Sequence, residues 1–284
     1  MLPLIAGDLT ALDEGIWRVL APNPSMMTGP GTNTYIVHGD DGLIVIDPGP
    51  ASDQHTAALL SASKELEIPI TKIIVTHTHN DHSPGAKHLL QHLSDALLLG
   101  PDVPNDGLQD TTWEADTLLK HGDTLALHGG GKLRVIATPG HVGNHLCFLH
   151  EPKQLLFTGD HLINGSTVVI APPSGSMSAY LNSLTILQNE SITTIAPGHG
   201  NLIDTPQEYI TQTIAHRLKR EEKVKAALIE SEGQTLKELV LKAYDDTPSM
   251  LHGLATYSLW AHLIKLEEDN VAKQDKDERW WLLN

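Results

Sequence analysis

The segment 76–82 (THTHNDH) concentrates metal-binding side chains within a few residues. His77 and His79 stand two positions apart, so in an extended loop they project in the same direction and can reach one ion. Asp81 and His82 turn to the other side and can reach a second ion. Imidazole and carboxylate ligands suit zinc, a borderline-soft cation. The pattern therefore predicts a zinc-binding loop, and its alternative is a solvated polar turn.

One loop cannot supply every ligand, and three further candidates each follow an apolar strand-like run and a glycine. They are His141, Asp160 and His199. The glycine permits a tight backbone path that can hold a ligand against a metal. A single motif of this kind is more often a turn with a solvated side chain. Only the combination with the histidine-rich segment, in this order, predicts a shared site.

The elements that must position these ligands alternate between short apolar strands and helices. Strands are predicted at residues 31–37, 42–46, 72–76, 133–138, 146–149, 155–158 and 193–196. Helices are predicted at residues 51–66, 87–98 and 180–187. Each candidate ligand lies just past a strand, where a rigid scaffold commonly carries functional groups. The pattern predicts an α/β fold in which two sheets lie between helices.

The last part of the chain differs in character. Residues 216–230, 235–243 and 257–268 have helical composition, and Thr235 with Glu238 forms the signature of a capping box. Residues 271–283 are predicted to form a short hairpin with tryptophans that belong to the core of this part. We expect a catalytic domain over residues 1–212 and a winged-helix-like domain over residues 213–284.

The ordered pattern H-x-H-x-D-H, followed by His, Asp and His on later loops, resembles that of the metallo-β-lactamase superfamily. The resemblance implies the αββα sandwich of that family and a dinuclear zinc centre. It assigns to the first zinc His77, His79 and His141. It assigns to the second zinc Asp81, His82 and His199. Asp160 would bridge the two ions, and Asp81 and Asp160 are the candidate catalytic residues.

Such a centre implies a hydrolase. Two divalent ions about 3.5–4 Å apart share a hydroxide whose pKa falls toward 7, and this hydroxide attacks an electrophilic carbon or phosphorus. No Ser or Cys nucleophile is then required. The alternative that Cys147 is a nucleophile is less favoured, because the run 146–149 (LCFL) reads as a buried strand. Iron or manganese in place of zinc stays open.

The resemblance extends further, to the β-lactamase-like protein 2 group. It includes the segment 31–35 (GTNTY), the segment 180–184 (YLNSL) and a C-terminal winged helix that ends in 262–267 (HLIKLE). A mitochondrial member of that group is a single-stranded-RNA endoribonuclease, so kinship implies phosphodiester hydrolysis of RNA. The alternative substrate is a small thioester, ester, lactone or β-lactam.

Several residues near the predicted site have less specific signals. Thr32, Asn33 and His145 are candidate substrate-binding residues, with turn roles for the first two and a strand-surface role for His145 as alternatives. His161 is expected to be structural. Asp47 follows an apolar strand and either fixes a ligand imidazole or caps the turn before Pro48.

Composition limits the partners. The 284 residues include 17 histidines and carry a net charge of −16, from 19 basic and 35 acidic residues, which does not attract nucleic acid nonspecifically. The acidic excess is uneven, with 8 basic and 21 acidic residues up to residue 204 and 11 and 14 beyond it. The basic residues of 217–225 either contact phosphates or form the solvated face of a helix.

The remaining features limit the expected location of the protein and its partners. We expect no membrane span, because no apolar run of about 18 residues occurs. The first residues lack a basic n-region and an apolar core, so no secretory signal is predicted. One cysteine excludes an internal disulfide and fits a cytoplasmic location. The partner is a small molecule or single-stranded RNA, and a homodimer is left open.

Two other functional classes fit part of the pattern. A regulatory nucleic-acid binder would use a closed, four-coordinate structural zinc, yet the predicted set holds seven ligands. An oxidoreductase would place iron in the same ligands. Metal analysis separates the three classes.

Overall fold

The computed structural model describes residues 4–229 and 232–283, and contacts divide the chain into two units. The first unit contains residues up to 138, 144–167 and 191–206. The second contains residues 139–143, 168–190 and 207–284. The predicted domain boundary between residues 212 and 213 falls inside helix α4 (Pro206–Ala227) and stays a prediction.

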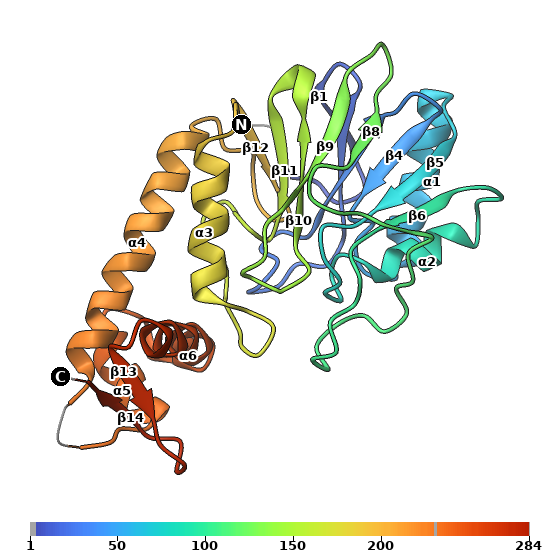
Figure 1. The fold of residues 1–284 in the computed structure, drawn as a ribbon. Coiled ribbons are helices and arrows are strands. Elements are labelled where there is room, and N and C mark those ends of the chain that lie inside the picture. Colours follow the sequence, from blue (N-terminus) through green and yellow to red (C-terminus); the bar gives the residue numbers. More distant parts are fainter. Residues whose placement is uncertain (1–3, 230–231, 284) are drawn as a thin grey trace. The chain divides into compact units, whose positions relative to one another are not determined.

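A mixed sheet of seven strands forms one layer of the first unit (Figure 1). In spatial order its strands are β1 (Leu9–Asp13), β2 (Ile16–Leu20), β3 (Asn33–His38), β4 (Leu43–Ile46), β5 (Ile70–Ile74), β6 (Leu97–Gly100) and β7 (Thr117–Leu118). Strands β1 to β4 run antiparallel to their neighbours, and β4 to β7 run parallel. The predicted strands at residues 31–37 and 42–46 are confirmed as β3 and β4, which form an antiparallel hairpin.

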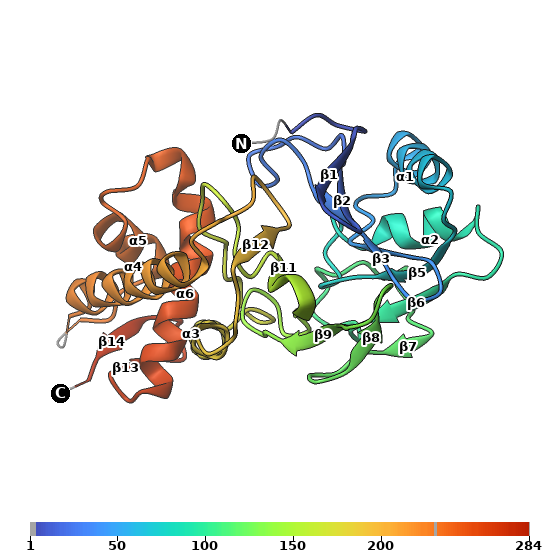
Figure 2. The ribbon, with the colours of Figure 1, turned by 90° about the horizontal axis from the view of Figure 1, so that it is seen from above.

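Strand β4 shows why the sheet is apolar on both faces, as strands covered on two sides are. Leu43 and Val45 pack with the helices α1 (Asp53–Leu66) and α2 (Pro84–Leu90), which cover one face (Figure 2). Ile44 and Ile46 point to the opposite face and join the core shared with the second sheet. The site described below lies where such buried strands end.

The second sheet of this unit has five strands. In spatial order they are β12 (Thr194–Pro197), β11 (Leu155–Gly159), β10 (Leu146–His150), β9 (Lys132–Ala137) and β8 (Thr124–Ala126). A short 3-10 helix, η1 (Glu151–Lys153), joins β10 to β11. Phe148 and Phe157 lie opposite each other in the register of β10 and β11, and both are buried in the core between the sheets.

The predicted helix over residues 87–98 is wrong beyond residue 90. Helix α2 ends at Leu90, and Leu97 and Leu98 belong to β6, where they pair with Lys72 and Ile73. A short apolar run such as 97–99 has no periodicity that separates a buried strand from a helix. Pairing with β5 decides between them.

The second unit is mainly helical. Its elements are α3 (Met177–Gln188), α4, α5 (Leu236–Ala243), the 3-10 helix η2 (Ser249–Leu251), α6 (His252–Glu268), β13 (Ala272–Gln274) and β14 (Trp280–Leu282). Helices α4, α5 and α6 and the hairpin enclose a small core around Trp280, which is fully buried. The predicted capping box of Thr235 and Glu238 is confirmed.

Helix α4 begins at Pro206, ten residues before the predicted start at His216. A proline is favourable in the first helical turn, because its missing N–H would have no partner there. The predicted end at residue 230 lies outside the described residues. Over the part of the chain that the structure describes, no helix combines the length and apolar character needed to cross a membrane.

Candidate metal centre

The histidine-rich loop follows β5 directly and is held by neighbouring loops. The backbone carbonyl of Thr78 accepts a hydrogen bond from the N–H of Asp110, 2.7 Å away. The Thr78 hydroxyl accepts one from the side-chain amide of Asn144 at 2.9 Å and donates one to Gln109 at 2.7 Å. Such contacts fix the loop backbone, so its side chains project from a rigid base.

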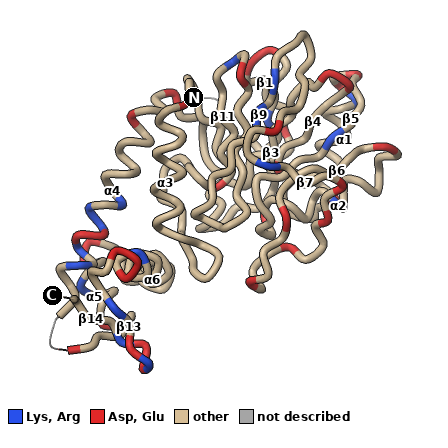
Figure 3. Tube along the Cα trace, in the orientation of Figure 1, with Lys and Arg blue, Asp and Glu red and all other residues tan. Residues whose placement is uncertain are grey.

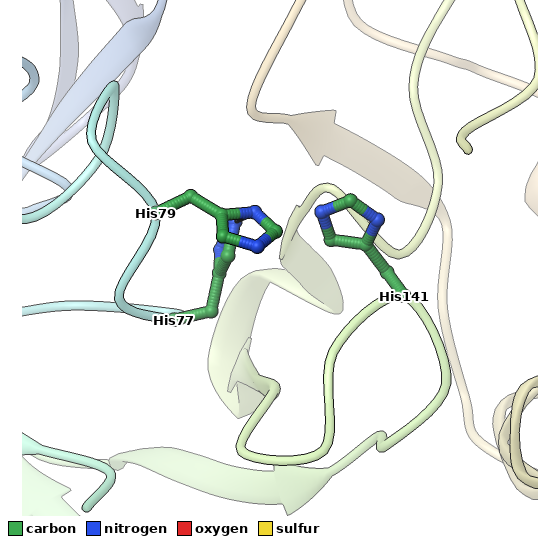
Figure 4. Close-up of side chains that lie close together, drawn as sticks. All are labelled: His77, His79 and His141. Carbon is green, nitrogen blue, oxygen red and sulfur yellow. Dashed lines mark hydrogen bonds between the residues drawn. The ribbon is translucent and has the colours of Figure 1, made fainter. Parts of the chain in front are cut away.

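The structure brings candidate ligands together in three groups, in each of which the ligand atoms lie within 4.8 Å of one another. The groups are His77, His79 and His141; His77, His82 and Asp160; and Asp81, His82 and His199. Figure 4 shows the first, with His77 and His79 on one loop and the ring of His141 turned toward them. His141 stands on the turn 139–143, which connects β9 to β10.

Asp160 and Asp81 face the same two imidazoles. The Oδ1 atom of Asp160 lies 3.1 Å from Nε2 of His199 and 3.4 Å from Nε2 of His82. The Oδ2 atom of Asp81 lies 3.3 Å and 3.6 Å from the same two nitrogens. Both imidazoles therefore turn Nε2 toward a pair of carboxylates.

Asp47 determines which ring nitrogens of His77 and His82 carry protons. Its Oδ2 atom accepts a hydrogen bond from Nδ1–H of His82 at 2.9 Å and another from the Thr76 hydroxyl at 2.8 Å. Because that hydroxyl donates its proton to Asp47, it accepts from Nδ1–H of His77, 3.0 Å away. In the neutral form of both histidines Nε2 is thereby the nitrogen without a proton, as a metal ligand must be.

Backbone carbonyls do the same for two other histidines. Nδ1–H of His199 donates to the carbonyl oxygen of Gly31 at 3.2 Å, and Nδ1–H of His141 donates to that of Val169 at 2.7 Å. A carbonyl oxygen can only accept, so Nδ1 carries the proton in both rings. Nε2 is again the nitrogen available to a metal.

The pKa values of these groups reflect burial and mutual charge. Burial works against the charged form of His82, yet the carboxylates of Asp81, Asp160 and Asp47 outweigh it and raise its pKa. Burial also opposes the charge of His199, whose pKa the Asp160 carboxylate raises to about 10. Burial, reinforced by the neighbouring imidazoles, lowers the pKa of His77. The carboxylates therefore stabilise positive charge at the site.

The donor set fits a divalent metal ion on these observations. The imidazoles of His77, His82, His141 and His199 each have their second nitrogen fixed by an acceptor or a hydroxyl. Carboxylates complete the set, and imidazole with carboxylate is the donor chemistry of zinc, iron and manganese sites. Which metal is bound, and how many ions, is part of the proposal below.

The candidate substrate-binding residues are all buried. The Thr32 hydroxyl accepts from the side-chain amide of Asn23, and the Asn33 amide donates to the carbonyl oxygens of Pro197 and Gly200, each 2.8 Å away. The His145 ring stacks on His77 with centroids 5.0 Å apart, and its Nδ1 lies 2.9 Å from the Thr138 hydroxyl. Their predicted contact with substrate stays a prediction.

Sequence reasoning missed three participants: Thr76, Gly31 and Val169. Thr76 directly precedes the histidine cluster, and a hydroxyl at that point was a usable signal. Gly31 and Val169 act through backbone carbonyls, which carry no signal of residue type. Asp47 was weighed as a partner of a ligand imidazole, and its carboxylate does receive Nδ1–H of His82.

The model of the Metallo-beta-lactamase superfamily matches residues 27–199, more than half of the chain. The chain belongs to this superfamily. A second family model, the Beta-lactamase associated winged helix domain, matches residues 235–280. The predicted fold, a metallo-β-lactamase αββα sandwich with a C-terminal winged helix, is confirmed.

Relatives cover nearly the whole chain. A beta-lactamase-like protein 2 homolog of Caenorhabditis elegans is 29% identical over 95% of this chain and 90% of its own. An atrochrysone carboxyl ACP thioesterase of Aspergillus chevalieri is 31% identical over 97% and 89%. A beta-lactamase domain protein of Burkholderia ambifaria has a similar structure, with a TM-score of 0.83, 18% identity, and coverage of 100% and 95%. The chain is a hydrolase of the metallo-β-lactamase superfamily.

Proposed function

We propose that this hydrolase binds two zinc ions and cleaves thioesters of small acyl groups. The observation that carries the two-metal part is the group of His77, His82 and Asp160. His77 belongs also to the group with His79, and His82 belongs also to the group with His199. The group that contains Asp160 thus shares one histidine with each of the other two groups. This arrangement suits a pair of adjacent ions with a carboxylate between them.

In this proposal each residue keeps the role that the resemblance implies. His77, His79 and His141 would hold the first ion. Asp81, His82 and His199 would hold the second, and Asp160 would serve both. When bound, two divalent ions lower the pKa of water toward 7, which supplies a nucleophile, and they polarise the carbonyl group under attack.

The chain's own groups prepare this chemistry. Asp47, the Gly31 carbonyl and the Val169 carbonyl keep the ligand imidazoles in one tautomer. Between the two carboxylates at the site, the side chain of Asp81 is 30% exposed and that of Asp160 is 13% exposed. We assign Asp81 as the carboxylate that a substrate meets and that takes a proton from attacking water.

A covalent mechanism through the single cysteine is disfavoured. Cys147 is fully buried in β10, and burial raises the pKa of its thiol to about 12. A thiol of that pKa stays protonated at neutral pH, and the thiolate is the reactive form. Activation of water is therefore the favoured route.

Two features favour a thioester over RNA as the substrate. A relative of similar length is named an acyl-carrier-protein thioesterase. The chain is also strongly acidic, with a net charge of −16, and RNA binding relies on cationic contacts to phosphates.

The basic residues of α4 add a structural reason. Arg217 is buried and donates to the carbonyl oxygen of Val168, Arg220 pairs with Asp246 at 2.8 Å, and Lys223 pairs with Asp245 and Asp246. Acidic and basic segments alternate along this helix (Figure 3). Most of the cationic side chains of residues 217–225 are therefore already engaged within the protein.

Hydrolysis of single-stranded RNA is the second candidate. It is supported by the winged-helix family match over residues 235–280 and by the smaller acidic excess beyond residue 204. A winged helix can bind nucleic acid, but it also serves as an interface or a lid.

A substrate panel tests the proposal. Purified enzyme loaded with zinc is given an acyl thioester, single-stranded RNA and a chromogenic β-lactam, with the Asp160→Ala and His79→Ala variants as controls. We expect thioester turnover that both variants lose. RNA cleavage lost in the variants and no thioester turnover would shift the assignment to the second candidate, and RNA cleavage retained in the variants marks a contaminant.

Metal analysis tests the two-zinc part separately. Mass spectrometry of the purified chain is expected to find two zinc ions per chain. One tightly held zinc without turnover on any substrate would favour the regulatory binder with a structural metal. Iron with redox activity would favour the oxidoreductase.

A further inference from the structure

The turn that carries His141 belongs to the second unit through its contacts. The carbonyl oxygen of Pro139 accepts from the Ser183 hydroxyl of α3 at 2.8 Å, and that of Gly140 accepts from the N–H of Ser176 at 2.8 Å. Gly140 has φ 152, and a Cβ there would lie 2.4 Å from Cα of Tyr180. The turn is therefore seated against α3 so closely that only glycine fits.

A short strap, residues 168–170, holds the imidazole of His141. The carbonyl oxygen of Val169 accepts from Nδ1–H of His141 at 2.7 Å. The peptide group that contains this carbonyl and the peptide group before it are each held by the C-terminal helices. Arg217 of α4 donates to the carbonyl oxygen of Val168, and the N–H of Ile170 donates to the Ser258 hydroxyl of α6 at 3.3 Å.

Both anchoring side chains are buried, so these contacts are shielded from water. Arg217 is 3% exposed and Ser258 is 6% exposed. The guanidinium of Arg217 also lies over the ring of Tyr180, 5.2 Å from its centroid, on the helix against which Gly140 is seated. Hydrogen bonds from a charged donor are about twice as strong as neutral ones. A single side chain of α4, Arg217, thus contacts both the strap, through Val168, and α3, through Tyr180.

We propose that Arg217 and Ser258 are positioning residues for the candidate metal ligand His141, so that helices α4 and α6 set which nitrogen of its ring can bind a metal ion. They fix the Val169 carbonyl, which holds the proton on Nδ1 and leaves Nε2 for the ion. The inference rests on the proposed metal centre for its consequence. Its premise, the tautomer of His141, can be measured in the metal-free chain.

The physical reason for a functional effect is the tautomer. A neutral imidazole without a fixed acceptor at Nδ1 populates both tautomers, and in one of them Nε2 carries a proton and cannot bind. Partners that orient a ligand histidine contribute about 10–100-fold to metal affinity or activity. Loss of Arg217 should therefore weaken one ion and spare the other, whose ligands Asp81, His82 and His199 have different partners.

Arg217→Gln, Arg217→Lys and Ser258→Ala are the test variants. Lys219→Gln removes the same charge from an exposed position of α4, and Leu239→Ala weakens the C-terminal core without touching the strap. Long-range proton–nitrogen NMR on the metal-free proteins reports the tautomer of His141. Chelator competition then gives the affinity of each zinc ion.

We expect wild type and Lys219→Gln to show His141 with its proton on Nδ1, and Arg217→Gln to show a mixture of tautomers. One of the two zinc ions should lose about 10–100-fold in affinity in Arg217→Gln, with partial recovery in Arg217→Lys and a smaller loss in Ser258→Ala. The other zinc should keep its affinity within about 2-fold, because its ligands have separate partners.

Two results would overturn the inference. One is a folded Arg217→Gln protein in which His141 keeps the Nδ1–H tautomer and both ions keep wild-type affinity. The other is an equal loss in Leu239→Ala, which would mean that general destabilisation is the cause. Failure of the proposed function looks different: the tautomer responds to Arg217→Gln as expected, but the wild-type chain binds fewer than two ions.

Discussion

Nδ1 of His82 lies 2.9 Å from Oδ2 of Asp47, a residue 35 positions earlier in the chain. Asp47 has the left-handed φ of 51, and both its oxygens are in use: Oδ1 accepts from the N–H of Thr76 at 2.7 Å. A non-glycine residue in this conformation costs free energy that the surrounding structure must supply. The side chain of this residue, whose backbone is strained, thus links the end of β4 to the loop of candidate ligands.

Replacement of Asp47 by Asn should weaken metal binding. Asn tolerates the left-handed conformation, so the backbone is preserved, but its single acceptor oxygen cannot serve His82 and both donors of Thr76. We expect metal affinity and turnover to fall about 10–100-fold. Metal content after dialysis and kcat are the measurements, with the exposed Asp53→Asn as control. Unchanged metal content in Asp47→Asn would contradict the role of this carboxylate.

Removal of the carboxylate of Asp160 should affect both ions. Its Oδ1 atom lies within 3.4 Å of Nε2 of His82 and of His199. Asp160→Ala should reduce the zinc content from two ions to one or none and lower kcat about 100-fold or more, since a lost ligand costs at least as much as a lost orienting partner. Circular dichroism checks the fold. An Asp160→Ala protein with two ions and wild-type kcat would rule out a bridging role.

Gly31 should not tolerate a side chain. It has φ 145, and a Cβ there would lie 2.1 Å from the carbonyl oxygen of Ala21. Gly31→Ala should cost about 2–3 kcal/mol in the free energy of unfolding and displace the carbonyl that holds His199. Gly29→Ala is the matched control, with φ 58 and open space around the new Cβ, and should cost about 1 kcal/mol. Urea unfolding compares them, and equal losses would show that the close approach is unimportant.

The ion cluster around Glu221 predicts a pH-dependent stability. Burial raises the pKa of Glu221, but hydrogen bonds from His262 and Lys265 outweigh it and lower the pKa below its usual value. A lowered pKa means that the charged form stabilises the fold above the unfolded pKa of about 4.3 and that this stabilisation is lost as pH falls through the folded pKa.

Glu221→Gln should therefore be less stable than wild type at pH 7 by about 1–3 kcal/mol. The difference should begin to shrink as pH falls below the unfolded pKa of about 4.3 and approach zero below the lowered folded pKa, where the wild-type side chain is neutral too. Urea unfolding of the metal-free proteins from pH 3 to pH 8 measures it. A difference that does not change with pH would assign the loss to packing.

Metal removal should abolish activity and lower stability. A metal that binds only the folded chain stabilises it by about 2.7 kcal/mol when its concentration is 100 times Kd. A strong chelator should therefore lower Tm as well as stop turnover, and added zinc should restore both. Full turnover by protein with no metal detectable by mass spectrometry would refute the two-metal proposal.

Much of the fold could be read from local patterns. Strands β3, β4 and β9 to β11 are apolar runs bounded by turn residues, and the capping box at Thr235 is a local signal. The local patterns do not predict β1, β2, β7 and β8, and the predicted helix over residues 87–98 runs into the first half of β6. Their pairing depends on neighbours far away in the chain, so a short window carries little information about them.

For the candidate metal ligands, too, some features follow from local sequence and others depend on residues far away in the chain. Residue type and order alone predict the seven candidate ligands, because only a few types of side chain bind metal ions. The sequence could not indicate which acceptor holds each imidazole. Two of those acceptors are the carbonyl oxygens of Gly31 and Val169, and every residue has a carbonyl.

By itself, then, the sequence determined the donor chemistry of the candidate site, with His77, His79, Asp81 and His82 on one loop, and the helical character of the C-terminal part. Only the tertiary structure decided that Arg217 is buried beneath the strap of His141 and that Asp47 serves His82. The physical reason is that the side-chain type of a residue decides whether it can be a metal ligand. Ligand orientation depends on backbone positions brought together by folding, and those carry no local signature.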